Sequence, residues 1–124
     1  MLPTDDKDRK ALPIFTGPLM YFPDAFAAIA AVCKAGNDQH NPGEPLHWAR
    51  EKSTDQMNTA LRHMIDHGTG NRQDTDGTWH LAKAAWRLLA ELQLSIEEQQ
   101  GKITRGKDGV PRALIAAPVR TDMP

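Results

Sequence analysis

Residues 78–98, with the sequence TWHLAKAAWRLLAELQLSIEE, decide the expected fold. Apolar side chains recur in this stretch at the spacing of an α-helix, so we predict a helix from about Thr78 to Glu98. The predicted apolar face consists of Trp79, Ala82, Ala85, Trp86, Leu89, Leu92 and Ile96. The other face carries His80, Lys83, Arg87 and Glu91. This pattern is typical of a helix that packs one side against a core.

Another helix is predicted upstream, beginning at Pro23 and Asp24. Proline suits the first turn of a helix, and aspartate complements the helix dipole there. We expect this helix to end at Gly36, as a left-handed cap. Its apolar residues, 26–33, cover every side, which predicts burial on more than one face. Its alanines would let another helix approach closely, either in the same subunit or across a dimer interface.

The third predicted helix opens at Ser53, because the spacing from Ser53 to Gln56 matches a capping box, and it closes at Gly68. One apolar stripe at helical spacing consists of Met57, Ala60, Leu61, Met64 and Ile65. The opposite side carries Asp55, Thr59, Arg62 and Asp66, and the stripe is flanked by His63 and His67. The connection from Gly36 to Lys52 is longer than most loops in compact domains, which favours a functional role.

These elements predict an all-α fold, a small bundle of three main helices that we expect to form a homo-oligomer. We divide the 124 residues into an irregular N-terminal arm (1–22), a helical domain that carries the binding site (23–100) and a basic C-terminal tail (101–124). Apolar residues in the arm indicate that it packs onto another surface. The tail is compatible with a short β-hairpin around Asp108 and Gly109.

Composition narrows the class of protein. The chain is 40% hydrophobic and 25% charged, near the averages of globular domains, which argues against disordered and fibrous classes. A net charge of −1 argues against a duplex nucleic acid as partner. No apolar run approaches the length of about 18 residues that a membrane span needs. Cys33 is the single cysteine, and the charged start does not resemble a signal peptide, so we expect a reducing, cytoplasmic setting.

Residues 74–80, DTDGTWH, lead into Lys83 and Arg87 and form the strongest candidate for an anion site. A helix N-terminus offers free amide donors and positive dipole potential, and nearby cations would add to its affinity for phosphate. The alternative is a solvated helix face with an ordinary pair between Arg87 and Glu91. The candidate ligand-binding residues are His47, Trp48, Arg62, His63, His80, Lys83 and Arg87. Among them, the Trp48 indole would stack on a base.

Two kinds of metal site are open. Mg²⁺ on a triphosphate needs carboxylates placed together, and the candidates are Asp66, Asp74 and Asp76. Alternatively, His63 and His67 lie four residues apart on one predicted helix, where two imidazoles can share a zinc ion. Further zinc ligands could come from His40, His47 or His80, and the alternative is a set of ordinary histidines at the edge of the core. In an enzyme, the candidate catalytic residues are His63, Asp66, Asp76 and His80, with a histidine as the base.

Three motifs carry a resemblance to a known family: KAGNDQHNPGEPLHW at 34–48, LRH at 61–63 and DGTWHLAKAAW at 76–86. In this order they resemble a phage and prophage family named for the N-terminal domain of dATP/dGTP diphosphohydrolases, over about residues 11–98. The resemblance implies an all-helical nucleotide-binding protein that splits a deoxynucleoside triphosphate into monophosphate and pyrophosphate with a divalent metal. By position it carries over His47, Arg62, His63, Gly77 and His80.

Three functions therefore stay open. The first is a (deoxy)nucleoside triphosphate pyrophosphohydrolase, with Mg²⁺ on the aspartates and with Arg62, Lys83 and Arg87 neutralising the phosphate charge. The second is a protein that sequesters a nucleotide, or a host defence nucleotide signal, without cleaving it. The paired glutamates of all-helical nucleotide pyrophosphohydrolases are missing here, which favours the second function. The third is a helical protein–protein adaptor.

Overall fold

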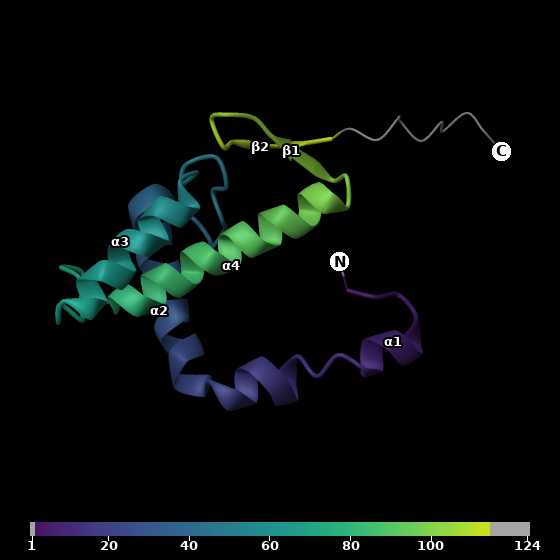
Figure 1. Ribbon diagram of the computed structural model, residues 1–124, viewed down its shortest axis with the longest axis horizontal. Helices are drawn as coiled ribbons and strands as arrows, with labels where there is room; N and C mark the ends of the chain where they lie inside the picture. Colours follow the sequence, from purple (N-terminus) through teal and green to yellow (C-terminus); the bar gives the residue numbers. More distant parts are fainter. Residues whose placement is uncertain (1, 115–124) are drawn as a thin grey trace.

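The computed structural model describes residues 2–114, which are mostly helical (Figure 1). The elements are α1 (Asp6–Lys10), a π-helical turn η1 (Phe15–Leu19), α2 (Pro23–His40), α3 (Gln56–Gly68), α4 (His80–Gln99), β1 (Ile103–Arg105) and β2 (Pro111–Ala113). The three predicted main helices and the predicted hairpin are confirmed. The arm is less irregular than predicted, since the Asp5 carboxylate accepts the backbone N–H of Lys7 at 2.8 Å and caps α1.

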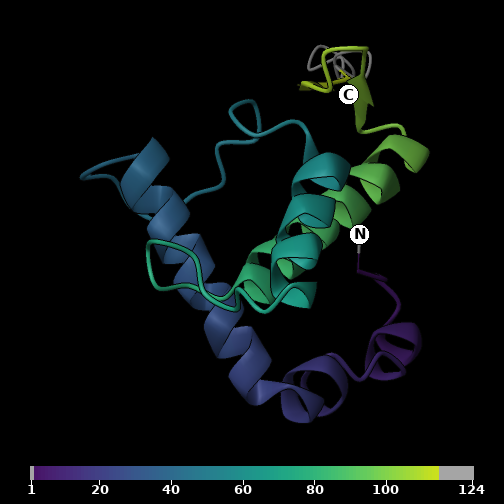
Figure 2. The same ribbon diagram turned by 60° about the vertical axis from the view of Figure 1, so that its left-hand side comes forward.

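α3 and α4 form an antiparallel hairpin, and α2 packs on α4 (Figures 1 and 2). The turn between α3 and α4 is closed by its own polar groups. The Asp74 N–H donates to the Thr78 carbonyl at 2.8 Å, and Asp76 accepts the N–H and hydroxyl of Thr78 at 3.0 and 2.7 Å. Gly77 adopts a φ of 83°, which glycine tolerates without strain. This turn places His80 at the start of α4, opposite α3.

α2 continues to His40, so the prediction that it ends at Gly36 is wrong. A glycine inside a helix costs about 1 kcal/mol relative to alanine. Here the following loop holds the last turn in place, because the Asn37 side chain donates to the Glu44 carbonyl at 3.0 Å and accepts the His47 N–H at 3.2 Å. The predicted burial of this helix on several faces is not met within one subunit, because none of its residues is fully buried in the single chain.

The side of α4 that faces inward coincides only in part with the predicted apolar face. Of that face, Ala82 is buried and Ala85 and Trp86 are half-buried, but Trp79, Leu89, Leu92 and Ile96 are exposed. The buried residues are His80, Ala82, Ala84, Ala90 and Leu94, whereas the exposed apolar residues are Leu81, Leu88, Leu89, Leu92 and Ile96. Polar side chains can lie inside because they pair across the helices, as His80 does with His63. α3 behaves in the same way. Its buried residues are Gln56, Thr59 and Ala60, and its exposed apolar residues are Met57, Leu61, Met64 and Ile65.

The C-terminal hairpin is antiparallel and lies against the end of α4 (Figure 1). Ile103 is buried, and Pro111 stands at the start of β2, where a missing N–H is tolerated. The Arg105 guanidinium donates to Glu91 at 2.7 and 3.0 Å and through Nε to Glu98 at 2.6 Å. These bonds raise the pKa of Arg105, above all through Glu91. One side chain therefore fastens the hairpin to the helix.

Replacing Arg105 by alanine is expected to lower the free energy of unfolding by about 2 kcal/mol, because two partly buried carboxylates lose their charged partner. Urea denaturation measures the loss, and hydrogen exchange at β1 shows whether the hairpin has separated from α4. Arg112→Ala is the matched control. Its ion pair with Asp108 is exposed on both sides, so no measurable change in the free energy of unfolding is expected. Equal losses in the two variants would contradict this prediction.

The same contact predicts a dependence of stability on acid. The hydrogen bond from Arg105 lowers the pKa of Glu91 from its ordinary 4.5. A carboxyl group with a lowered pKa in the folded state stabilises the protein above its unfolded pKa, and this contribution disappears as the pH falls. Thermal unfolding between pH 7 and pH 3 should therefore show a smaller loss of stability on acidification in Arg105→Ala than in the unmodified protein. Identical pH profiles would contradict the assignment.

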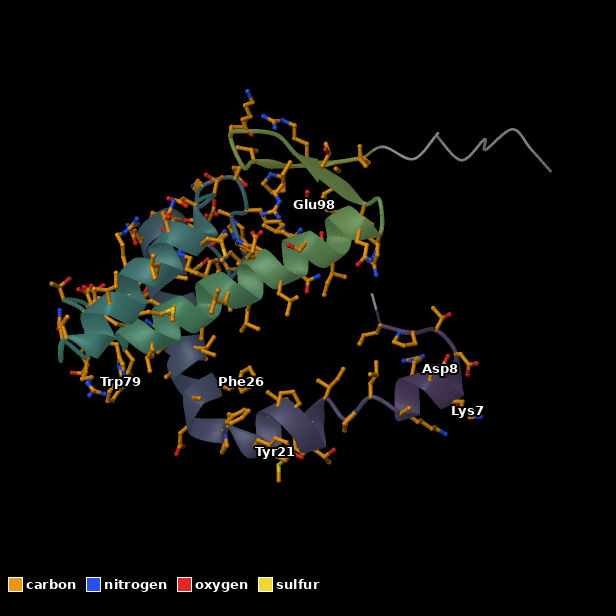
Figure 3. All side chains as sticks on the ribbon, in the orientation of Figure 1. Lys7, Asp8, Tyr21, Phe26, Trp79 and Glu98 are labelled. Atoms are coloured by element: carbon orange, nitrogen blue, oxygen red, sulfur yellow. The ribbon has the colours of Figure 1, made fainter. Side chains whose placement is uncertain are left out.

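The N-terminal arm lies away from the α3–α4 hairpin (Figure 2). The large apolar side chains of the arm, of which Figure 3 labels Tyr21, are exposed: Leu12, Ile14, Phe15, Leu19, Met20, Tyr21 and Phe22. Within the described part of the chain, no single helix is long and apolar enough to cross a membrane. The bent pair of Asp6–Leu19 and Pro23–His40, which meet at 88°, passes that test by length and composition only.

Candidate functional site

A cleft of about 420 Å³ lies between α2, the loop that follows it, and the α3–α4 hairpin. This volume is in the range of about 300–1,000 Å³ that is typical of small-molecule sites. The hairpin side of the cleft is lined by His63, Asp76, Lys83, Trp86 and Arg87. The loop side includes Leu46, His47 and Trp48. Three separate segments of the chain thus meet around one cavity.

The loop between α2 and α3 is anchored at several points and forms one wall of the cleft. The Asn41 side chain is 5% exposed and donates to the His47 carbonyl at 3.2 Å. The Arg50 guanidinium binds both oxygens of Glu97 at 2.6 and 3.1 Å. Lys52 donates to the carbonyl of His40 at 2.7 Å. The loop whose unusual length suggested a functional role is therefore held against α2 and α4.

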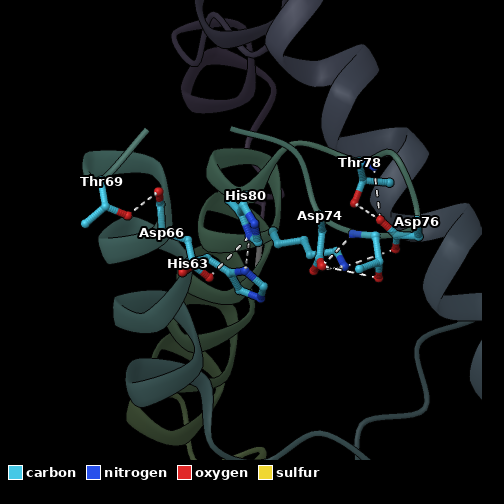
Figure 4. A network of polar contacts seen from close by, with 9 residues as sticks. His63, Asp66, Thr69, Asp74, Asp76, Thr78 and His80 are labelled. Carbon is cyan, nitrogen blue, oxygen red and sulfur yellow. Dashed lines mark hydrogen bonds and ion pairs between the residues drawn. The ribbon is translucent and has the colours of Figure 1, made fainter. Parts of the chain in front are cut away.

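His63, Asp66, Asp74 and His80 come together where α3, the turn and the start of α4 meet, and we call them the His–Asp cluster (Figure 4). The two Nδ1 atoms of His63 and His80 lie 2.8 Å apart, and Asp66 Oδ2 lies 3.8 Å from His80 Nδ1. The His80 side chain is 4% exposed. Its Nε2 is buried and has no hydrogen-bond partner among residues 2–114.

The protonation state of the cluster follows from its surroundings. Burial is the main cause that lowers the pKa of His63 from 6.5, and the nearby His80 and Lys83 lower it further. His63 is therefore a neutral imidazole at neutral pH. Because it also lines the cleft, it can accept a hydrogen bond, a proton or a metal ion from a bound ligand.

Lys83 is held between two carboxylates. Its Nζ lies 2.7 Å from Asp74 Oδ2 and 3.0 Å from Asp76 Oδ2. Burial opposes the charged form of Lys83, but the bonds to the two aspartates together raise its pKa. The bond from Lys83 lowers the pKa of Asp74, and the bonds from Thr78 lower that of Asp76 to about 2. The two carboxylates, which belong to the turn before α4, thus pair with the lysine that the sequence predicted to bind phosphate.

Arg87 is the cleft cation that lacks a carboxylate partner. It is half-buried, and its Nη1 donates to the neutral Gln56 Oε1 at 3.2 Å. Burial lowers its pKa, and the charge of Arg62 lowers it further. Arg62 donates to the Thr59 hydroxyl at 3.0 Å, and neither arginine forms an ion pair within the described residues. Arg87 thus lines the cleft with no described carboxylate in direct contact, although the charge of Asp55 opposes the lowering of its pKa. A guanidinium whose donors are not taken by a carboxylate can bind an anion.

The two predicted ligand-binding residues of the loop, Trp48 and His47, are less available to a ligand than the sequence suggested. The Arg50 guanidinium lies 4.4 Å from the centre of the Trp48 ring, and Trp86 packs against Trp48 edge to face at 5.7 Å. One face of the indole is therefore already occupied. Its Nε1 is buried without a partner among the described residues. His47 is half-exposed, with its Nδ1 3.1 Å from the Pro45 carbonyl.

Sequence reasoning missed Gln56 as a residue of the site. The spacing from Ser53 predicted a capping box, but no side chain caps α3. Instead Gln56 is 2% exposed, donates to the Ser53 carbonyl at 2.6 Å and accepts from Arg87. A buried glutamine that orients an arginine 31 positions later leaves no local signal in the sequence. His67, the alternative zinc ligand, contacts Arg72 at 3.1 Å and is not part of the His–Asp cluster.

The chain was compared with known families, curated proteins and solved structures. Residues 4–104 match the family described as "dATP/dGTP diphosphohydrolase, N-terminal". No curated protein and no solved structure matches. The matched range covers most of the chain, including α2, α3, α4 and every residue of the cleft and the His–Asp cluster. The chain therefore belongs to the dATP/dGTP diphosphohydrolase N-terminal family.

Proposed function

We propose that the cleft binds a (deoxy)nucleoside triphosphate and that the protein hydrolyses it to the monophosphate and pyrophosphate. The observation that carries this proposal is a cavity with two ligand-binding groups on its walls: Arg87, which has no carboxylate in direct contact among the described residues, and the His63 imidazole. The cavity is large enough for a nucleotide, and the family description names dATP and dGTP. The family description supports nucleotide hydrolysis as the class of function. The residues of the cleft support binding of a phosphate group.

Arg87 is the proposed phosphate ligand, with Arg62 adding charge from α3. A half-buried guanidinium binds phosphate oxygens through two parallel hydrogen bonds, and burial strengthens the interaction. His47 and the free face of Trp48 are the proposed contacts to the nucleoside. Lys83 can reach a phosphate only by leaving Asp74 or Asp76, so it is a weaker candidate than the sequence predicted.

The proposed reaction forms a bond between a water oxygen and the α-phosphorus and breaks the bond from that phosphorus to the pyrophosphate oxygen. The proposed catalytic residues are His63, Asp66, Asp76 and His80, of which His63 and Asp76 line the cleft. The expected Mg²⁺ site on Asp66, Asp74 and Asp76 fits the structure poorly, because of these three only Asp74 belongs to the described side chains that converge on one point, whereas Asp76 binds Lys83 and Thr78. We therefore assign no step to Mg²⁺ on these three residues.

The test is incubation of the purified protein with dATP, dGTP and their ribonucleotide counterparts, with divalent metals, followed by chromatography of the nucleotides. We expect the monophosphate and pyrophosphate in equal amounts. Release of orthophosphate, or full recovery of the triphosphate, would contradict the hydrolase.

Asp74 and Asp76 both bind Lys83, which favours a second candidate function. In this function the protein sequesters a nucleotide without cleaving it. Binding phosphate needs cations and donors but no activated water, and Arg87 meets that need. Isothermal titration calorimetry with the same nucleotides distinguishes the two functions. Binding with the intact ligand recovered after denaturation would support sequestration. Absence of binding for every nucleotide would leave the adaptor function.

A further inference from the structure

Three metal-ligating side chains of the His–Asp cluster converge on one point. His63 and His80 each offer a ring nitrogen and Asp74 offers a carboxylate oxygen, and these three atoms lie within 4.8 Å of one another. They come from α3, from α4 and from the turn that joins them (Figure 4). The turn is closed by its own hydrogen bonds, so the backbone positions of the three residues are set before any ligand binds.

The distances are close to those of a metal site. Two nitrogens bound to one tetrahedral zinc ion at about 2.0–2.1 Å lie about 3.3 Å apart. The Nδ1 atoms of His63 and His80 lie 2.8 Å apart and face each other, with ring centres 5.1 Å apart. A separation of the rings by about half an ångström would admit an ion, a change that small side-chain rotations supply.

The charge and chemistry of the cluster select the class of ion. Around the two imidazoles stand three aspartates and one lysine, Asp66, Asp74, Asp76 and Lys83, which leaves a net charge of −2 when both histidines are neutral. A divalent cation matches that charge. Imidazole is a preferred ligand of zinc and of the other divalent transition metals, whereas Mg²⁺ prefers oxygen ligands alone. The His80 ring is 4% exposed, and its Nδ1 faces the Nδ1 of His63, so this nitrogen is shielded from bulk water.

We propose that His63, Asp74 and His80 bind a divalent transition-metal ion of the zinc class, with Asp66 beside it. This site replaces the all-aspartate Mg²⁺ site that the sequence predicted, and it is distinct from the helical pair of His63 and His67. The proposal stands independently of the proposed function, because the metal alone is its ligand.

The test uses the full chain without a polyhistidine tag and titrates it with Co²⁺, Zn²⁺ and Mg²⁺. Calorimetry should show one Co²⁺ or Zn²⁺ per chain, with visible ligand-field bands for Co²⁺, and at least tenfold weaker binding of Mg²⁺. His63→Ala and Asp74→Asn should each weaken Co²⁺ binding at least tenfold. Both residues are only half-buried, so these variants are expected to fold, which circular dichroism verifies.

His67→Ala is the matched control, because His67 lies one turn beyond His63 on the same helix. It should leave Co²⁺ affinity unchanged. Loss of binding in His67→Ala would move the site to the helical pair and overturn the proposal. Unchanged binding in His63→Ala, or Mg²⁺ affinity equal to that of Co²⁺, would overturn it as well. A failure of nucleotide binding would not, since no nucleotide enters the titration.

An independent observation concerns the outer surface. Among the described residues, the buried apolar set consists of six residues, four of them alanine, whereas twenty large apolar residues are more than a third exposed. Contiguous exposed apolar surface marks an interaction site. The single chain therefore leaves apolar surface uncovered that a second copy can bury.

Much of the uncovered apolar surface lies on one side of the α3–α4 hairpin. We call it the apolar hairpin face, which consists of Met57, Leu61, Met64, Ile65, Leu81, Leu88, Leu92 and Ile96, all more than a third exposed. In each helix the exposed apolar stripe is rotated about the helix axis from the buried side by about 100°, which is one residue further along the chain. Because the helices are antiparallel, both stripes lie on the same side of the hairpin. No charged residue is among them, so two copies can meet there without like charges in contact.

We infer that a second copy of the chain covers the apolar hairpin face in a two-fold dimer. Sedimentation velocity at micromolar concentration should give twice the mass of 13.7 kDa. Leu61→Lys combined with Leu92→Lys should raise the dimer dissociation constant at least tenfold, because it places charge at the centre of the interface. Tyr21→Ser, at a 74% exposed site on the arm, is the control and should leave the dimer intact. A monomeric unmodified chain, a dimer that persists in the double variant, or loss of the dimer in the control would overturn the inference.

Discussion

Replacing Leu94 by alanine is expected to lower the free energy of unfolding by about 3–4 kcal/mol, the largest effect of any single truncation in α4. Leu94 is 2% exposed and is the largest fully buried side chain of the described residues. The rest of the buried apolar set is small, consisting of Ala60, Ala82, Ala84, Ala90 and Ile103. Alanine side chains cannot move to fill the cavity that the truncation of Leu94 leaves. Nearly the whole cost of that cavity should therefore appear in the free energy of unfolding. Domains have only about 5–15 kcal/mol of stability in total.

Urea denaturation followed by circular dichroism measures the effect, and Leu46→Ala is the control. Leu46 is 68% exposed in the loop, so its truncation should cost less than about 0.5 kcal/mol. A loss below about 1 kcal/mol in Leu94→Ala would show that the core lies elsewhere, for example in the proposed dimer interface. The comparison is made at one protein concentration, because dimerisation would add to the apparent stability.

Arg87→Met is expected to weaken the binding of dATP and dGTP at least tenfold in a protein that still folds. The guanidinium contributes charged hydrogen bonds to phosphate, each worth about 1.5–3 kcal/mol. In the unliganded protein the same group is half-buried without an ion pair, and burial lowers its pKa. Methionine keeps the apolar stem and removes the charge, but it leaves the buried Gln56 Oε1 without its donor, so the free energy of unfolding should fall by about 1–2 kcal/mol.

Calorimetry with each nucleotide and urea denaturation of the apo protein give the two readings. Arg112→Met is the matched control, since Arg112 is exposed and pairs with Asp108 away from the cleft. It should leave nucleotide affinity unchanged. Arg87→Lys should recover only part of the affinity, because an ammonium cannot bind phosphate in the bidentate way. Unchanged affinity in Arg87→Met would contradict the phosphate site, and a large loss of stability would show that Arg87 is structural.

The helices could be predicted from the sequence because their signals are local. The period of apolar residues, the proline at position 23 and the glycine at position 68 each act within a few residues of the element that they define. The failure at Gly36 has the same physical origin. The bonds that carry α2 onward come from Glu44 and His47, which lie in the loop beyond the helix. A local signal was overridden by contacts that form only after the loop folds back.

The candidate site was predicted as a set of residue types and not as an arrangement. The sequence pointed to His63, His80 and the aspartates, but the spacing of seventeen residues between the two histidines carries no information about their contact. The turn between α3 and α4 brings the two imidazole rings into contact. Gln56 with Arg87 and Arg50 with Glu97 are separated by 31 and 47 residues, so neither pair could be predicted.

The helical class, the three main helices, the C-terminal hairpin and the family could all be predicted from the order of the residues. Which face of α3 and α4 points inward could be seen only once the helices had packed. An amphipathic pattern divides a helix into two sides, but the inward side is the one whose groups find partners. Here the polar side finds them, as His80 does in His63, while Leu88 and Leu92 stay exposed. That choice depends on the free energy of polar pairing across two helices, a quantity that no single helix contains.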